Sequence, residues 1–194
     1  MAACHQDCEQ LLKAFVESVE PRGFIRAIDV AGGDGRLAAG KIFEPYTRVD
    51  FFDQCSLAVS KAHSAMKEKK NLGYISRAMM QKFAWPFFYS AIFMVLCSGY
   101  LGRAELLTFM RKAKSHLLAV GARTTRQSPP QSFIFLLENV RESEEMPYTW
   151  KGQEIRSLKE LEAIIKEAGL LVKKCSGKQP MPGNFSDVCI WALY

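Results

Sequence analysis

Short apolar runs alternate with amphipathic stretches along this chain of 194 residues. Runs rich in Val, Ile, Leu and Phe predict buried strands, whereas apolar residues that recur every three or four positions predict helices. The helices are predicted to begin near Asp7, Arg36, Ser56, Leu106 and Ser157. The strands are predicted at residues 24–30, 48–52, 74–76, 89–96, 133–137, 170–174 and 186–194.

The alternation of strands and helices predicts an α/β fold in a single domain over residues 1–194. We expect a Rossmann-like sheet of seven strands, with helices on both faces. The runs at 170–174 and 186–194 are joined by a turn rich in Gly and Pro, which predicts an antiparallel hairpin at the C-terminal edge. Residues 121–132 and the polar stretch 140–156 are predicted to be surface loops.

Composition narrows the class of protein without identifying a partner. A hydrophobic content of 48% is enough for one substantial core. The net charge is +6, but the basic residues are spread along the chain, so nucleic acid is not a favoured partner. Residues 83–102 carry no charge, yet Pro86, Ser90 and Gly99 interrupt them, which favours a buried strand over a membrane span.

The cysteines and histidines give no sign of a metal site. The six cysteines form no Cys-x-x-Cys pair, and the three histidines lie far apart in the sequence. Reduced thiols in an intracellular protein, cytoplasmic or nuclear, are the favoured interpretation. We also expect no secretory signal, because no long apolar region follows a basic start.

A glycine-rich turn follows the first predicted strand and suggests a nucleotide-like ligand. Asp29 lies near the end of this strand, and Gly33 and Gly35 follow in a pattern that fits a dinucleotide or S-adenosylmethionine. Asp29 would repel a pyrophosphate but would attract the ammonium and sulfonium of S-adenosylmethionine. Asp53 ends the second predicted strand about 20 residues later, where an acid can bind ribose hydroxyls. A tight turn without any ligand is the alternative.

Several short segments occur in an order that is typical of one family. They are residues 27–29, 49–53, 81–83, 99–101, 138–139 and 167–170. In these segments the chain resembles the eukaryotic alpha N-terminal protein methyltransferases, which methylate the α-amine of exposed Xaa-Pro-Lys ends. The resemblance extends roughly from residue 8 to residue 194. It implies a class I methyltransferase fold, S-adenosylmethionine as the cofactor and a protein N-terminus as the substrate.

The resemblance also implies which residues contact the cofactor. The turn holds the methionine part, the second acid holds the ribose, and a pair of residues later in the chain contacts the adenine. These positions are Asp29, Ala31, Gly33, Gly35 and Arg36 for the methionine part, Asp53 for the ribose, and Met80 and Gln81 for the adenine. Val95 stands where the family has a further glutamine at the cofactor.

For the acceptor amine, the resemblance implies that Asn139 and Tyr100 are the catalytic residues, although Tyr100 replaces a family histidine. Ala31 likewise replaces the first glycine of the turn. The family's aspartates should fall near residues 148–152, where Tyr148 and Lys151 stand instead and Lys151 would repel a cationic peptide end.

Acidic residues upstream could replace those aspartates if their segment folds over the pocket, although a solvated surface is favoured. They are Glu138, Glu142, Glu144 and Glu145.

Two functions are therefore kept open. The first is methyl transfer from S-adenosylmethionine to a protein amine. The second is an inactive methyltransferase fold that serves as a structural or regulatory subunit for an obligate protein partner. Nucleic-acid methylation is a weaker third hypothesis, because the chain has no Asn/Asp-Pro-Pro-aromatic motif after the fourth predicted strand.

Overall fold

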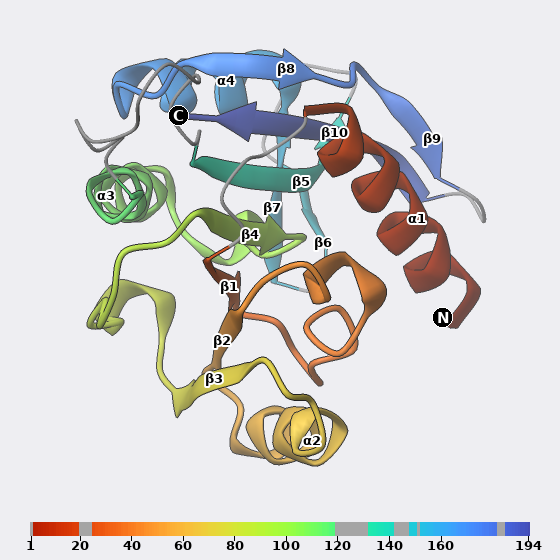
Figure 1. Ribbon diagram of the computed structural model, residues 1–194. Helices are drawn as coiled ribbons and strands as arrows, with labels where there is room; N and C mark the ends of the chain where they lie inside the picture. The colour runs from red at the N-terminus through yellow and green to blue at the C-terminus, as the bar shows by residue number, and fades with distance from the viewer. Residues whose placement is uncertain (1, 20–24, 119–131, 142–147, 151, 182–184) are drawn as a thin grey trace, which may run out of the picture.

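One mixed sheet runs through the computed structural model, which describes residues 2–19, 25–118, 132–141, 148–150, 152–181 and 185–194 (Figure 1). Its main strands lie in the order β3-β2-β1-β4-β5-β10-β8. Their bounds are β1 Arg26–Val30, β2 Arg48–Asp53, β3 Leu72–Arg77, β4 Ala91–Val95, β5 Phe133–Arg141, β8 Val172–Cys175 and β10 Phe185–Leu193.

The strand directions confirm the predicted fold class. Strands β1 to β5 pair in parallel, whereas β10 runs antiparallel to both β5 and β8. The short strand β9, Gln179–Met181, also pairs antiparallel with β10. The antiparallel C-terminal hairpin therefore lies at the sheet edge, with β8 outermost among the main strands and β10 next to it.

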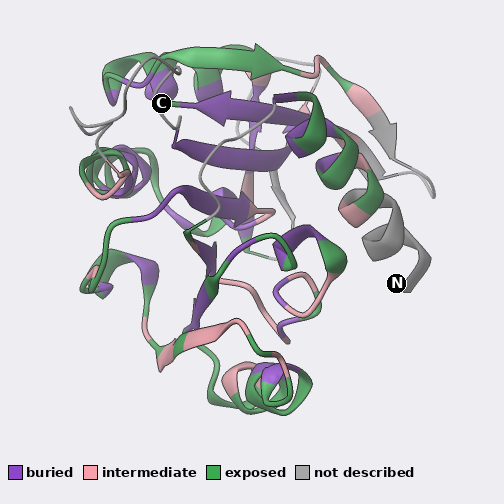
Figure 2. Cartoon of the chain, in the orientation of Figure 1, coloured by how far each residue is buried: buried purple, intermediate pink, exposed green. Residues whose placement is uncertain are grey.

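Helices cover both faces of the sheet, as Figure 1 shows for α1 and α3. Helices α1 (Ala2–Val19) and α2 (Ser56–Met66) pack on one face, where Leu12 and Ala62 join a cluster with Phe51 and Phe93. Helices α3 (Arg103–Ser115) and α4 (Leu158–Glu167) bury their apolar residues against the other face. The central strands are buried except at a few positions near their ends (Figure 2), which explains why they are nearly continuous apolar runs in the sequence.

The predicted helix beginning at Arg36 is wrong. Residues 31–40 form turns, and only a short 3-10 helix, η1 (Lys41–Phe43), follows them. Gly35, Gly40 and Pro45 disfavour a regular helix across this segment. Ile42 and Phe43 of η1 are buried and take the place on the sheet that a helix would have covered.

The predicted surface loop at 140–156 is also wrong in its described part. Strand β5 continues to Arg141, and β6 (Tyr148–Trp150) pairs with β7 (Gln153–Ser157), which in turn pairs with the end of β5. Strand β7 is polar, so hydropathy did not reveal it, yet most of its residues are buried. The predicted capping box is confirmed, because Ser157 Oγ accepts a bond from the Glu160 backbone N–H and Glu160 accepts one from that of Ser157.

Two predictions at the ends of elements change as well. Helix α1 begins at Ala2 rather than near Asp7. The predicted loop at 121–132 lies outside the described residues except for Ser132, which is buried. None of the described helices combines the length and apolar character needed to span a membrane.

Candidate functional site

A cavity of about 760 Å³ opens at the carboxyl ends of the parallel strands, within the size range of small-molecule sites. Ligands bind at this edge in open α/β sheets, because the loops after neighbouring strands meet there. The lining residues follow β1, β2, β3, β4 and β5 and include one residue of β7. They are Asp29, Ala31, Gly32, Gly33, Asp34, Arg36, Leu37, Asp53, Gln54, Cys55, Ala58, Ala78, Met80, Gln81, Val95, Leu96, Tyr100, Leu101, Asn139 and Gln153.

Asp29 of β1 is a buried carboxylate without a full set of partners. Its side chain is only 1% exposed, and its Oδ2 atom has no hydrogen-bond partner among the described residues. Burial raises the pKa of Asp29 to about 7, with a further contribution from the Asp53 carboxylate and an opposing hydrogen bond from the Ala38 backbone. A buried carboxylate with one oxygen unsatisfied at a cavity wall is suited to a cationic group.

The turn after β1 brings the backbone close to the cavity. Ala31 adopts a left-handed φ of +50°, and Gly33 has a φ of +62°. A Cβ on Gly32 would lie 2.5 Å from Asp29 Oδ2 and from Phe51, whereas one on Gly33 would meet nothing within 4 Å. Gly32 is therefore required for packing, and Gly33 leaves its backbone open to the cavity.

Gly35 is the one predicted site residue that does not line the cavity. Its φ is +77°, and a Cβ there would lie 2.6 Å from the Cβ of Ala62 in α2. Gly35 thus allows α2 to approach the turn closely.

Asp53 connects the turn after β1 with the start of the segment after β2 through two hydrogen bonds. Its Oδ2 accepts the Gly33 N–H at 3.0 Å, and its Oδ1 accepts the Cys55 N–H at 2.8 Å. The carboxylate is 8% exposed and lies at the end of β2. Each oxygen keeps a lone pair that can accept a further hydrogen bond from a ligand.

The remaining predicted cofactor residues lie around the same cavity. Arg36 forms an exposed ion pair with Asp34 at 2.8 Å. Met80 is buried in a short 3-10 helix, η2 (Met80–Lys82), and Gln81 donates to Glu105 at 3.4 Å. Val95, the last residue of β4, is half-buried at the cavity wall. The structure brings these side chains together, and their individual roles stay predictions.

The part of the cavity beyond β4 in the sheet order is lined by Tyr100, Asn139 and Gln153, which belong to the segment after β4, to β5 and to β7. Tyr100 is 54% exposed, in the short 3-10 helix η3 (Ser98–Tyr100). Asn139 follows Glu138 in β5, and Gln153 begins β7 and donates to the Leu96 carbonyl at 3.3 Å. Leu96 has a left-handed φ of +53°, an uncommon conformation for a branched apolar residue.

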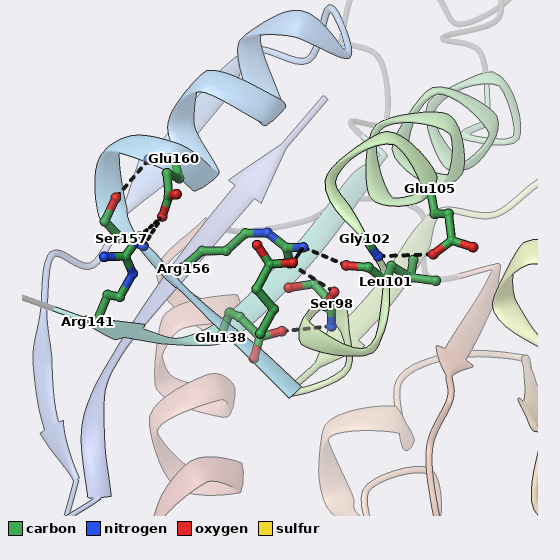
Figure 3. A network of polar contacts seen from close by, with 10 residues as sticks. Ser98, Leu101, Gly102, Glu105, Glu138, Arg141, Arg156, Ser157 and Glu160 are labelled. Carbon is green, nitrogen blue, oxygen red and sulfur yellow. Dashed lines mark hydrogen bonds and ion pairs between the residues drawn. The ribbon is translucent and has the colours of Figure 1, made fainter. Parts of the chain in front are cut away.

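A buried polar network fixes the position of η3 beside this part of the cavity (Figure 3). Glu138 Oε2 accepts the Ser98 N–H at 2.8 Å, and its other oxygen accepts the Asn139 N–H at 3.2 Å. The Arg156 guanidinium donates to the Ser98 carbonyl at 3.1 Å and to the Leu101 carbonyl at 2.5 Å. Burial raises the pKa of Glu138. Glu138 is thus part of the support of the cavity and not a solvated surface acid.

Sequence reasoning missed Gln153, Leu96 and Arg156. Gln153 and Arg156 belong to a polar strand that lacks the apolar alternation by which strands are recognised, and no local pattern predicts a left-handed leucine. Two expectations cannot be followed further, because Glu142, Glu144, Glu145 and Lys151 lie outside the described residues. No group of three or more metal-ligating side chains occurs in the part of the chain that the structure describes.

Comparisons with known proteins agree with this geometry. A family described as AdoMet-dependent proline di-methyltransferase matches residues 5–194. No curated protein matches the sequence.

Among solved structures, a SAM-dependent methyltransferase from Leishmania major has a TM-score of 0.84 at 20% identity, covering 100% of this chain and 74% of its own. The N-methyltransferase NodS from Bradyrhizobium japonicum has a TM-score of 0.75 at 10% identity, covering 98% and 96%. A SAM-dependent methyltransferase from Clostridium acetobutylicum has a TM-score of 0.71 at 11% identity, covering 95% and 89%. At these identities the likeness shows the fold alone.

Proposed function

Because the chain belongs to the AdoMet-dependent proline di-methyltransferase family, we propose that it transfers methyl groups from S-adenosylmethionine to the α-amine of a protein N-terminus. The family establishes the cofactor and the reaction class. The α-amine as acceptor is the proposal, and the chemistry of the cavity supports it.

The cofactor end of the cavity fits S-adenosylmethionine, which supplies an electrophilic methyl group on a sulfonium when bound. Asp29 offers a buried carboxylate whose Oδ2 has no partner among the described residues, and a cation beside it would favour its charged form. The turn at Gly33 offers open backbone, and Asp53 offers free lone pairs for hydroxyl groups. Asp29, Gly33 and Asp53 would therefore hold the cofactor.

The acceptor end carries the argument for an α-amine. All carboxylates among the described lining residues, Asp29, Asp34 and Asp53, come from β1, the turn after it and β2. The acceptor end instead presents the neutral side chains of Tyr100, Asn139 and Gln153. Because the described lining at this end includes no carboxylate that could act as a base, the site favours an amine that is already partly neutral.

The pKa values of amines decide which acceptor meets this need. An α-amine has a pKa of about 7.8, so roughly one in seven is neutral at pH 7. A lysine ε-amine, with a pKa of about 10.4, is neutral in only about one of 2,500 molecules. The proposed acceptor is therefore some 300-fold better populated in the reactive form than a lysine side chain.

Asn139 is the residue we assign to orient this amine. Its side-chain oxygen can accept an N–H of the neutral amine, which leaves the nitrogen lone pair free to attack the methyl carbon. The bond from its own backbone N–H to Glu138 fixes the position of Asn139 in β5. Tyr100 is largely exposed in the cavity lining, so water can reach this part of the site and take up the proton released after transfer.

The test is methyl transfer to short peptides with free N-termini, followed by mass spectrometry. Peptides that begin Ala-Pro-Lys and Pro-Pro-Lys should both gain methyl groups. The Pro-Pro-Lys peptide should gain at most two at its terminus, because a secondary amine has room for two. The same peptides with acetylated N-termini are the controls and should remain unmodified.

Variants separate cofactor binding from acceptor binding. Asn139→Ala should lower kcat/KM for peptide by about tenfold to a hundredfold, the size expected for one lost hydrogen bond, with unchanged S-adenosylmethionine affinity by calorimetry. Asp53→Ala should abolish the heat of cofactor binding. Methylation of acetylated peptides at the same rate would overturn the α-amine proposal. Absence of any cofactor binding by the unmodified protein would leave the scaffold hypothesis.

A further inference from the structure

Two cysteines lie side by side in the C-terminal hairpin, outside the lining of the cavity. Cys175 ends the edge strand β8 and is exposed, whereas Cys189 is buried in β10. Their sulfur atoms are 3.3 Å apart, within hydrogen-bond distance. The pair brings together residues 14 positions apart in the sequence.

Hydrogen bonds around the pair favour a thiolate on Cys175. Its sulfur accepts the Gly177 N–H at 3.5 Å and faces the Cys189 thiol, while Ser176 Oγ donates to the Cys189 sulfur at 3.9 Å. The bond from the Cys189 thiol lowers the pKa of Cys175 to about 6 and raises the pKa of Cys189. Glu162 of α4 faces Cys175 and opposes this shift. The exposed sulfur is thus the nucleophile of the pair.

We propose that Cys175 and Cys189 form an oxidisable dithiol, a modification site for hydrogen peroxide that closes to a disulfide between β8 and β10. The site is independent of the proposed methyl transfer.

The reaction proceeds in two balanced steps. The Cys175 thiolate attacks one peroxide oxygen, the O–O bond breaks, and the departing hydroxide takes up a proton to become water, which leaves a sulfenic acid on Cys175. The Cys189 sulfur then attacks the Cys175 sulfur, and the S–O bond breaks. The leaving hydroxide takes the proton of the Cys189 thiol. Two thiols lose two electrons in total, and one peroxide is reduced to two waters.

The place of the pair in the fold suits both steps. Peroxide can reach Cys175 because every residue of β8 is exposed. A disulfide requires the sulfurs to approach to about 2.05 Å, a movement of roughly 1.2 Å from their present separation. An edge strand, which pairs on one side only, can make that movement more easily than a central strand. Cys189 is shielded within the sheet, so it is suited to attack the oxidised Cys175 and not peroxide itself.

The experiment treats the reduced full chain with a small molar excess of hydrogen peroxide, alkylates the remaining thiols and maps the products by mass spectrometry. The expected product is a peptide pair linked through Cys175 and Cys189. Cys175→Ser should abolish the link. Cys189→Ala should instead leave a sulfenic acid on Cys175 that a 1,3-dione probe captures. Cys55→Ser, which removes another exposed cysteine, is the matched control and should leave the link intact.

A second measurement keeps the test valid if Cys189→Ala fails to fold. As the pH is lowered, the rate of Cys175 alkylation in the unmodified protein should drop to half its maximum near pH 6. For an ordinary thiol the same half-maximal rate is reached near pH 8.5. A disulfide link that forms through Cys55 would overturn the proposal. So would the absence of any link together with an alkylation midpoint near pH 8.5. A link that persists in Cys175→Ser would do the same.

Discussion

At the scale of single residues, Asp29 is a side chain whose burial lowers the stability of the fold at neutral and alkaline pH. Its carboxylate is buried, and its pKa is raised to about 7 from an ordinary value of 3.8. A raised folded-state pKa means that the contribution of this group to stability is fully present below about pH 4. That contribution is lost as the pH rises through 7. Above this range the fold holds an unpaired charge.

Asp29→Asn should therefore stabilise the protein at alkaline pH. The gain over the unmodified chain should grow from near zero at about pH 4 to about 2–4 kcal/mol at pH 8, given about 1.4 kcal/mol per pKa unit. Urea denaturation at several pH values measures it. Asp34→Asn, at an exposed carboxylate, is the control and should show no such trend. Equal stability of Asp29→Asn and the unmodified chain at every pH would contradict the burial argument.

Ala31 occupies a backbone conformation that suits glycine. A left-handed alanine costs about 1–2 kcal/mol, and a glycine there costs about 0.5–1 kcal/mol in chain entropy. Ala31→Gly should therefore raise the free energy of unfolding by about 0.5–1 kcal/mol.

Gly33→Ala is the matched control for Ala31→Gly. Gly33 shares the left-handed φ and has open space around it, so this reverse change should cost about 1 kcal/mol. Thermal denaturation of both variants measures the difference. A loss of stability in Ala31→Gly would show that the methyl group of Ala31 makes contacts worth more than its strain.

At the scale of elements, strand β7 supports through Arg156 the η3 segment, which carries Tyr100 to the cavity lining. This side chain is 2% exposed and donates to two backbone carbonyls of the η3 segment. Arg156→Met should cost about 2–4 kcal/mol, because it leaves buried carbonyls without their donors. Amide hydrogen exchange should also become faster at residues 98–101.

Arg103→Met is the control for this change. Arg103 forms an exposed ion pair with Glu167 at 2.7 Å, and such pairs contribute about 1 kcal/mol or less. Equal losses in the two variants, or unchanged exchange at residues 98–101 in Arg156→Met, would count against the proposed support of η3.

The elements that sequence reasoning predicted well are those with a strong local signal. The apolar strands β1, β2, β4 and β5 and the capped helix α4 follow directly from hydrophobic runs and from the Ser157–Glu160 pair. Strand β7 could not be predicted, because its buried residues other than Ile155 are polar, and Gln153 and Arg156 among them bond to distant segments. The helix predicted to begin at Arg36 is the opposite kind of error, because an element was predicted that does not form. There the glycines disfavour a helix more strongly than the spacing of apolar residues favours one.

For the whole molecule, the sequence predicted the sheet and the location of the site better than its chemistry. The residues proposed for the cofactor and the amine, apart from Gly35, surround one cavity because they follow successive parallel strands. Gln153 reaches the same cavity from a strand inserted after β5, and Arg156 and Glu138 hold the η3 segment beside it. Such long-range bonds leave no trace in local sequence.

The position of β10 has a consequence for the newly made chain. Strand β10 leaves the ribosome after every other strand of the described sheet, yet it pairs with β5 from Ile134 to Asn139. Until β10 emerges, a nascent chain carries the apolar β5, which also bears Asn139, with one side unpaired. Synthesis that stops before residue 185 yields a product with that open edge, a substrate for chaperones and proteases rather than an enzyme.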